Sequence, residues 1–126
     1  MPRVRTLVVD DHDQFLQVAA DVVRATPGFV RAGEAGSGAE ALAILEDAAP
    51  DLAIVDVRMP GIDGIELTKR IKARSPATVV ALISAEDPAH LPASAGACGA
   101  DAVARKQEFG PAMLRGMWAV HGRFDN

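Results

Sequence analysis

The sequence predicts an α/β protein in which a parallel five-stranded sheet carries helices on both faces. Three observations predict this class. Five short apolar segments alternate with five segments of helical periodicity along the 126 residues. The apolar segments show little polar alternation, which is typical of parallel strands buried on both faces. Four of them lead at once into acidic, hydroxyl or basic residues, and in open α/β sheets the ligand crevice lies beyond the carboxyl ends of the strands.

The first half of the chain contains two strand–helix pairs. Residues 4–10 form the first predicted strand, an apolar run with β-branched residues that ends in acid. The first helix follows, with Asp13 as its expected N-cap, and its apolar spacing stops at Thr26-Pro27-Gly28. Residues 29–35 are a weaker strand, and an Ala/Leu/Ile-rich helix is expected from about 39 to 48.

The central strand, residues 52–55, is an unbroken apolar run that ends in a single carboxylate, Asp56. Pro60-Gly61 and Asp63-Gly64 then favour a loop. A third helix is predicted over residues 64–74, because apolar side chains recur there along one stripe while charged ones face out.

The last third of the chain carries two more strands and a proline-rich segment between them. Residues 78–83 are another apolar strand, which stops at Ser84. Residues 86–99 contain two prolines and two glycines, each of which disfavours a helix interior, so a short or distorted helix is expected. Residues 101–104 form a short fifth strand, and the final helix spans about 111–120 with Trp118 as a core residue.

Composition limits the classes of protein that the chain can represent. With 49% hydrophobic and 24% charged residues the sequence is typical of one globular domain, expected over residues 1–126. A net charge of −4 provides no basic surface for nucleic acid. We expect a cytoplasmic protein, because no apolar run approaches the roughly 20 residues of a membrane span. The one cysteine, Cys98, is expected to be a small buried apolar residue.

Polar residues at the strand ends suggest a site at one edge of the sheet, formed by Asp10, Asp11, Asp56, Ser84 and Lys106. Three carboxylates in one crevice repel one another unless a cation joins them. Oxygen ligands without histidine or cysteine partners favour Mg²⁺. Each residue also has a structural interpretation: the first two acids could cap the first helix, the serine could cap the fourth, and the lysine could be solvated.

With a cation bound, a strand-end carboxylate can act as a nucleophile towards phosphorus and form an acyl phosphate. Such a transfer requires neutralisation of the phosphoryl oxygens. Lys106 supplies an ammonium group for this purpose and Ser84 a hydroxyl donor.

Four separated segments of the sequence resemble the receiver domain of bacterial two-component response regulators. They are the acidic pair after VRTLVVD, the segment DVRMPGIDGIEL, the LIS ending of the fourth strand and the segment GADAVARK. The resemblance implies a flavodoxin-like (βα)5 fold with strand order 2-1-3-4-5. It also implies that an aspartate accepts a phosphoryl group from a phosphohistidine of a histidine kinase or phosphotransfer protein.

By position, the resemblance identifies Asp56 as the phosphoacceptor. It implies that Asp11 and Asp56, with the backbone carbonyl of Arg58, bind Mg²⁺, while Asp10 acts mainly through bound water. Ser84 and Lys106 are similar to the switch hydroxyl and the phosphate-pairing lysine of receivers.

The sequence departs from most receivers at two positions near this lysine. Val103 replaces the usual aromatic switch residue, and Gln107 replaces a frequent proline. The second departure is similar to the NarL/FixJ-like regulators, whose receivers are joined to a DNA-binding domain. We therefore expect the receiver part of a transcriptional regulator, with DNA contact only through an effector domain absent from this chain and a homodimer through the output-face helices. The alternative is a free-standing receiver that acts by protein binding.

An enzyme interpretation is weaker. Haloacid-dehalogenase-like phosphatases also use a strand-end aspartate with Mg²⁺, but they place an acid two residues later, where this chain has Arg58. We therefore expect a switch rather than a turnover enzyme. The three histidines share no metal-ligand spacing and are expected at the surface, with His12 near enough to the acids to border the pocket.

Overall fold

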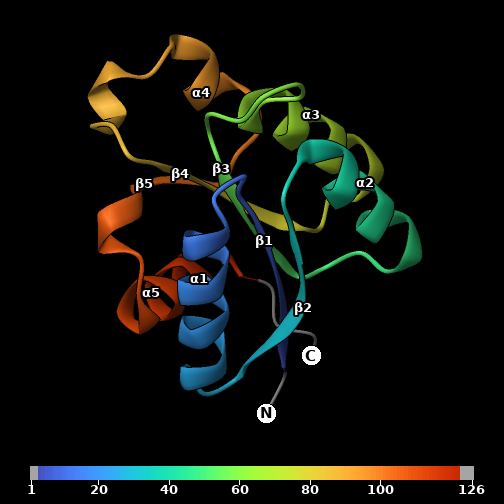
Figure 1. The fold of residues 1–126 in the computed structure, drawn as a ribbon, viewed down its shortest axis with the longest axis vertical. Coiled ribbons are helices and arrows are strands. Elements are labelled where there is room, and N and C mark those ends of the chain that lie inside the picture. Colours follow the sequence, from blue (N-terminus) through green and yellow to red (C-terminus); the bar gives the residue numbers. More distant parts are fainter. Residues whose placement is uncertain (1–2, 123–126) are drawn as a thin grey trace.

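The computed structural model describes residues 3–122 and confirms the predicted fold class (Figure 1). Five parallel strands form one sheet in the order β2-β1-β3-β4-β5. The strands are β1 (Val4–Val9), β2 (Phe29–Ala35), β3 (Leu52–Asp56), β4 (Val79–Ser84) and β5 (Ala102–Arg105). The helices are α1 (Asp13–Ala25), α2 (Gly38–Asp47), α3 (Gly64–Arg74), α4 (Ala93–Ala97) and α5 (Pro111–His121).

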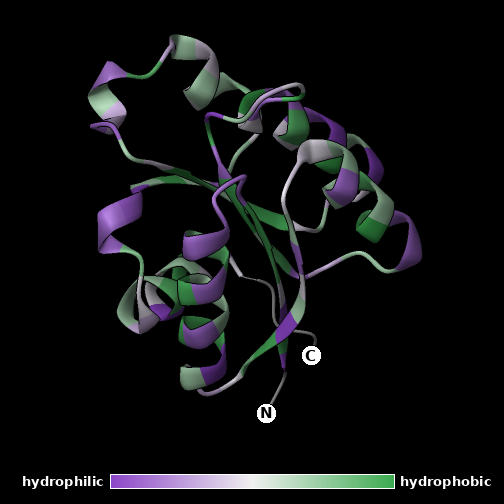
Figure 2. Ribbon diagram, in the orientation of Figure 1, coloured by the Kyte–Doolittle hydropathy of each residue, from purple (hydrophilic) through white to green (hydrophobic). Residues whose placement is uncertain are grey.

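Helices cover both faces of the sheet, with α1 and α5 on one side and α2 and α3 on the other (Figure 1). Each face has its own hydrophobic core. Alternate residues of β3 enter different cores: Leu52 and Ile54 pack beneath α1 and α5, whereas Ala53 and Val55 face the other layer. Figure 2 shows the central strands β1, β3 and β4 mostly in green, the colour of hydrophobic residues. Burial on both faces thus explains the absence of polar alternation in the sequence.

The start of α1 differs from the prediction. His12, not Asp13, is the N-cap residue, with φ −101° and ψ 110°, and no side chain caps the helix. Asp13 is the first residue of the helix itself, where its charge favours the positive end of the helix dipole. The carboxylate of Asp10 instead accepts a hydrogen bond from the backbone N–H of His12, at 2.8 Å. The acids before α1 are therefore arranged around a turn and do not cap the helix.

The segment between β4 and β5 is broken, as predicted. A single 3-10 turn, Pro88–His90, precedes α4, which has only five residues. Ser84 does not cap a helix: its Oγ accepts a hydrogen bond from the backbone N–H of Glu86 at 3.0 Å, and Asp87 caps the 3-10 turn instead. Cys98 is buried, as expected.

The interpretation of Trp118 as a core residue is also confirmed. Its side chain is partly buried against the core beneath α1 and α5, next to the buried Met117. Val103 on β5, in contrast, remains 36% exposed. Within residues 3–122, none of the helices has the length and apolar character that crossing a membrane requires.

Candidate functional site

The carboxyl ends of the strands bring the five predicted residues to one edge of the sheet. Asp56 and Ser84 are the last residues of β3 and β4, Asp10 directly follows β1, and Lys106 directly follows β5. β1 and β3 are neighbours at the centre of the sheet. The parallel topology therefore places the acids side by side and the serine and lysine next to them.

Three carboxylates and one imidazole form a compact group at this edge. One ligand atom from each of Asp10, Asp11, His12 and Asp56 lies within 4.8 Å of the others. Asp10 is fully buried and Asp56 is 5% exposed, whereas Asp11 and His12 reach solvent. The side of the group formed by the ends of β1 and β3 is therefore buried, and the side formed by the turn before α1 is open to solvent.

Lys106 is the cation that contacts this group. Its Nζ lies 2.5 Å from Oδ2 of Asp10 and 3.8 Å from Oδ2 of Asp56. The ammonium also lies 4.6 Å above the ring of Phe15, a cation–π contact from α1. Phe15 in turn packs against Phe109, with ring centroids 5.6 Å apart. An aromatic pair from α1 and the loop before α5 thus holds the lysine over the two buried carboxylates.

A small cavity of about 120 Å³ opens beside Asp56, lined by His12, Asp56, Arg58, Ser84, Ala85, Glu86 and Lys106. The guanidinium of Arg58, from the loop after β3, is paired with the carboxylate of Glu86, from the loop after β4. This contact holds the pKa of Glu86 below its usual range. The ion pair connects the two loops that border Asp56.

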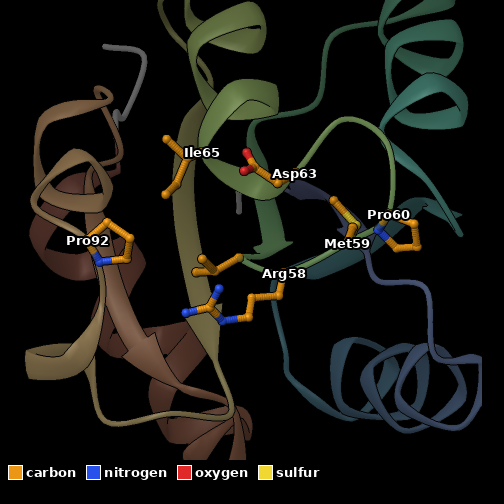
Figure 3. Close-up of a pocket in the computed structure, with 7 residues that line it drawn as sticks. Arg58, Met59, Pro60, Asp63, Ile65 and Pro92 are labelled. Carbon is orange, nitrogen blue, oxygen red and sulfur yellow. The ribbon is translucent and has the colours of Figure 1, made fainter.

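Arg58 also borders a second cavity of about 400 Å³ on the α3 side, together with Met59, Pro60, Asp63 and Pro92. Figure 3 shows its side chain reaching from the loop after β3 towards Pro92, below Ile65. Asp56 does not line this larger cavity.

Burial raises the pKa of Asp56 to about 6, and the neighbouring charges of Asp10 and Asp11 add to this effect. The charge of Lys106 and a hydrogen bond from the backbone N–H of Arg58 lower the pKa of Asp56, but these effects are smaller than the increase caused by burial and by the neighbouring acids. Without a further cation, the ionised site is therefore a strained arrangement of like charges. Ordinary carboxyl groups of this type have a pKa of 3.8.

This raised pKa predicts a falling stability as the pH rises. Asp56 binds its proton more tightly in the folded chain than in the unfolded chain. The protonated group therefore adds to the free energy of unfolding. This contribution is fully present below pH 3.8, the ordinary pKa, and is lost as the pH rises through the folded-state pKa of about 6. Without divalent metal, Asp56→Asn should therefore be more stable than the wild type by about 2 kcal/mol at pH 7.5. Urea unfolding at several pH values measures this difference, which should shrink towards pH 4; a difference independent of pH would contradict the assignment.

The residues present fit a divalent cation. Carboxylate oxygens are the ligands that Mg²⁺ prefers, and three carboxylates face one another here with a single ammonium as counter-charge. A bound cation would relieve the repulsion that raises the pKa of Asp56. Asp11 is the most accessible acid of the group, so one side of the group is open to water.

The expectation that His12 is a surface residue bordering the pocket is confirmed: its side chain is 67% exposed and lines the cavity beside Asp56. Sequence reasoning missed two contributors to the site, Glu86, which pairs with Arg58, and Phe15, whose ring contacts the ammonium of Lys106. Both depend on side-chain packing between distant segments.

The chain is similar to known proteins over most of its length. The family model of the response regulator receiver domain matches residues 6–117. A Pseudomonas aeruginosa protein described as a transcriptional regulator is 36% identical over 104 residues, which is 82% of this chain and 50% of that protein. The NarL regulatory protein of Mycobacterium tuberculosis is 36% identical over 85 residues, 68% of this chain and 39% of that protein. The chain thus spans half or less of the length of these relatives.

Solved structures are similar over nearly the whole chain. The signal receiver domain of the response regulator NarL from Mycobacterium tuberculosis is 30% identical and superposes with a TM-score of 0.82, covering 93% of this chain and 98% of that one. The response regulator domain of Thermotoga maritima CheB is 26% identical, with a TM-score of 0.83 and coverage of 98% and 99%. The similarity therefore includes every strand that contributes to the site.

Proposed function

The chain belongs to the response regulator receiver domain family of two-component systems, and we propose that it is a cytoplasmic phosphoacceptor modified on Asp56. The observation that carries this proposal is the position of Asp56. Its nearly buried carboxylate lies at the end of β3, between two further aspartates and one lysine, and borders a cavity that opens beside it.

The donor we propose is the phosphohistidine of a histidine kinase or phosphotransfer protein. A carboxylate oxygen of Asp56 attacks phosphorus and forms a P–O bond while the P–N bond of the donor breaks. The electron pair of the broken bond stays on nitrogen, and the imidazole leaves as the neutral ring with the proton that its other nitrogen carried in the phosphohistidine. Lys106 would pair with the phosphoryl oxygens, since its ammonium lies 3.8 Å from the acceptor carboxylate. Ser84 lines the same cavity and would donate its hydroxyl to the modified group.

Asp11 and Asp56, with the backbone carbonyl of Arg58, are the proposed direct ligands of Mg²⁺, and Asp10 would contribute to the same metal site mainly through bound water. When bound, the ion neutralises charge on the transferring phosphoryl group. The chain itself would position the reacting groups for the transfer. The ends of β1 and β3 fix the two buried carboxylates, and the cavity beside them is open to a small anionic group.

Removal of the metal tests this proposal. Incubation with a small acyl-phosphate donor and Mg²⁺ should add one phosphoryl group to the wild type, detected as an increase in intact mass. Excess chelator should reduce the labelling rate by at least about 100-fold, because several kcal/mol of charge stabilisation are lost. Equal labelling with and without Mg²⁺ would contradict the proposed role of the three carboxylates.

Lys106 should couple phosphorylation to a structural change. In Lys106→Ala, modification of Asp56 should continue, but the amide NMR shifts that phosphorylation causes in β5 and α5 should be largely lost, because the ammonium no longer pairs with the phosphoryl group. Lys69→Ala, an exposed residue of α3, is the matched control. Identical phosphorylation-linked shifts in Lys106→Ala and wild type would exclude this role.

The output proposed for the whole protein is transcriptional regulation. The matched relatives described as transcriptional regulators are at least twice the length that aligns here, and DNA contact would come from an additional effector domain. A free-standing receiver that acts through protein contacts is the alternative. A reading frame that continues past Asn126 into a DNA-binding domain would support the first function, and a stop codon there would favour the second.

A further inference from the structure

The imidazole of His12 belongs to the acidic group and lies on its solvent-exposed side. Its Nδ1 atom is 2.9 Å from Oδ1 of Asp10 and 3.3 Å from Oδ1 of Asp11. It belongs to the one group of three or more candidate metal-ligating side chains found within residues 3–122. The site therefore offers a nitrogen atom in addition to its carboxylate oxygens.

The turn before α1 fixes the position of this nitrogen. Oδ1 of Asp10 accepts both the backbone N–H of His12, at 2.8 Å, and the contact from Nδ1 of the same residue. The side chain is 67% exposed. Metal binding uses the lone pair of Nδ1, so the ring would bind an ion as the tautomer that carries its proton on Nε2. This choice of tautomer requires no movement of the backbone.

The distances between these atoms match a coordination sphere. Nitrogen and oxygen ligands lie about 2.1 Å from a divalent transition ion, so neighbouring ligands in an octahedron are about 3.0 Å apart and opposite ones about 4.2 Å. The two distances from Nδ1, 2.9 Å and 3.3 Å, are those of neighbouring ligands.

We propose that His12 is a direct metal ligand and gives this site a preference for divalent transition ions over Mg²⁺. Imidazole nitrogen binds Ni²⁺, Cu²⁺ and Zn²⁺ well, whereas Mg²⁺ prefers oxygen and retains several waters. The inference rests on the proposed function, because it assigns the ion that serves the phosphoacceptor site. With a nitrogen ligand in the site, the ion that occupies it would depend on which divalent ions are available.

Calorimetric titration of the metal-free protein with Ni²⁺ and, separately, with Mg²⁺ tests the inference. His12→Gln should weaken Ni²⁺ binding by at least about 10-fold, while Mg²⁺ binding changes less than about two-fold. His90→Gln, which alters an exposed histidine of the 3-10 turn, should change neither affinity. An unchanged Ni²⁺ affinity in His12→Gln, or an equal loss for both ions, would overturn the inference.

Pulsed EPR with less than one equivalent of Cu²⁺ gives a direct readout of nitrogen ligation. The ¹⁴N modulation of a bound imidazole should be present in the wild type and in His90→Gln, decrease when Mg²⁺ is added in large excess, and be absent in His12→Gln. Modulation that persists in His12→Gln would place the copper on another histidine and overturn the inference.

The two proposals fail in different ways. Mg²⁺-dependent labelling by the acyl-phosphate donor should be the same in the wild type and in His90→Gln, which leaves every residue of the site unchanged. If the wild type is not labelled, the proposed function is wrong whatever the metal titrations give. If labelling occurs but His12→Gln binds Ni²⁺ as the wild type does, only the role of His12 is wrong.

Discussion

Asp56→Asn is expected to abolish phosphoryl uptake from a small acyl-phosphate donor, lowering the rate by more than about 1,000-fold. The amide has almost the same shape as the carboxylate but carries no nucleophilic oxygen, so the pocket persists while the chemistry stops. Asparagine also removes one of the three facing carboxylates, so the folded structure should be at least as stable as the wild type at neutral pH. Intact-mass measurements over time give the rate.

Asp21→Asn is a suitable control for this experiment, because Asp21 lies on the exposed surface of α1, where it pairs with Arg24. The control should be labelled at the wild-type rate. Labelling of Asp56→Asn at that same rate would show that another residue accepts the phosphoryl group.

Gly64→Ala should have the largest effect on the fold. A Cβ atom at Gly64 would lie 2.1 Å from the backbone oxygen of Asp56 and 2.8 Å from Cα of Val57. Both are backbone atoms at the end of β3, so no side chain can rotate away and the start of α3 must shift. We expect a loss of about 3 kcal/mol in the free energy of unfolding, measured with urea, together with slower labelling of the displaced carboxylate.

Gly116→Ala is the matched control. Gly116 lies within α5, and a Cβ there meets no other atom within 4 Å. Because glycine in a helix interior is less favourable than alanine, this substitution should stabilise the protein by about 0.5 to 1 kcal/mol. Effects of the same sign and size at the two positions would mean that the close approach of α3 to β3 is not required.

The fold and the main site residues could be predicted because their signals are local. Unbroken apolar runs identify buried strands, and the parallel alternation places Asp56, Ser84 and Lys106 at one edge. The strand order is different: periodicity does not determine which strands are neighbours, so the order 2-1-3-4-5 came only from the resemblance to receivers and is confirmed by the structure.

The details that were missed depend on contacts between segments distant in sequence. Nothing local to Arg58 predicts its ion pair with Glu86, 28 residues later. The N-cap of α1 was assigned wrongly for a related reason. Propensity favours Asp13, but Asp10 holds the backbone N–H of His12 and so moves the start of the helix by one residue.

The central claim is that Asp56 is the residue that carries the phosphoryl group. Borohydride reduces an acyl phosphate of aspartate to homoserine, so reduction of the labelled protein, proteolysis and peptide sequencing by mass spectrometry identify the modified position. The account predicts homoserine at position 56 and aspartate at positions 10 and 11. Homoserine at another position, or a phosphoryl group on His12 or Ser84 that resists the reduction, would contradict it.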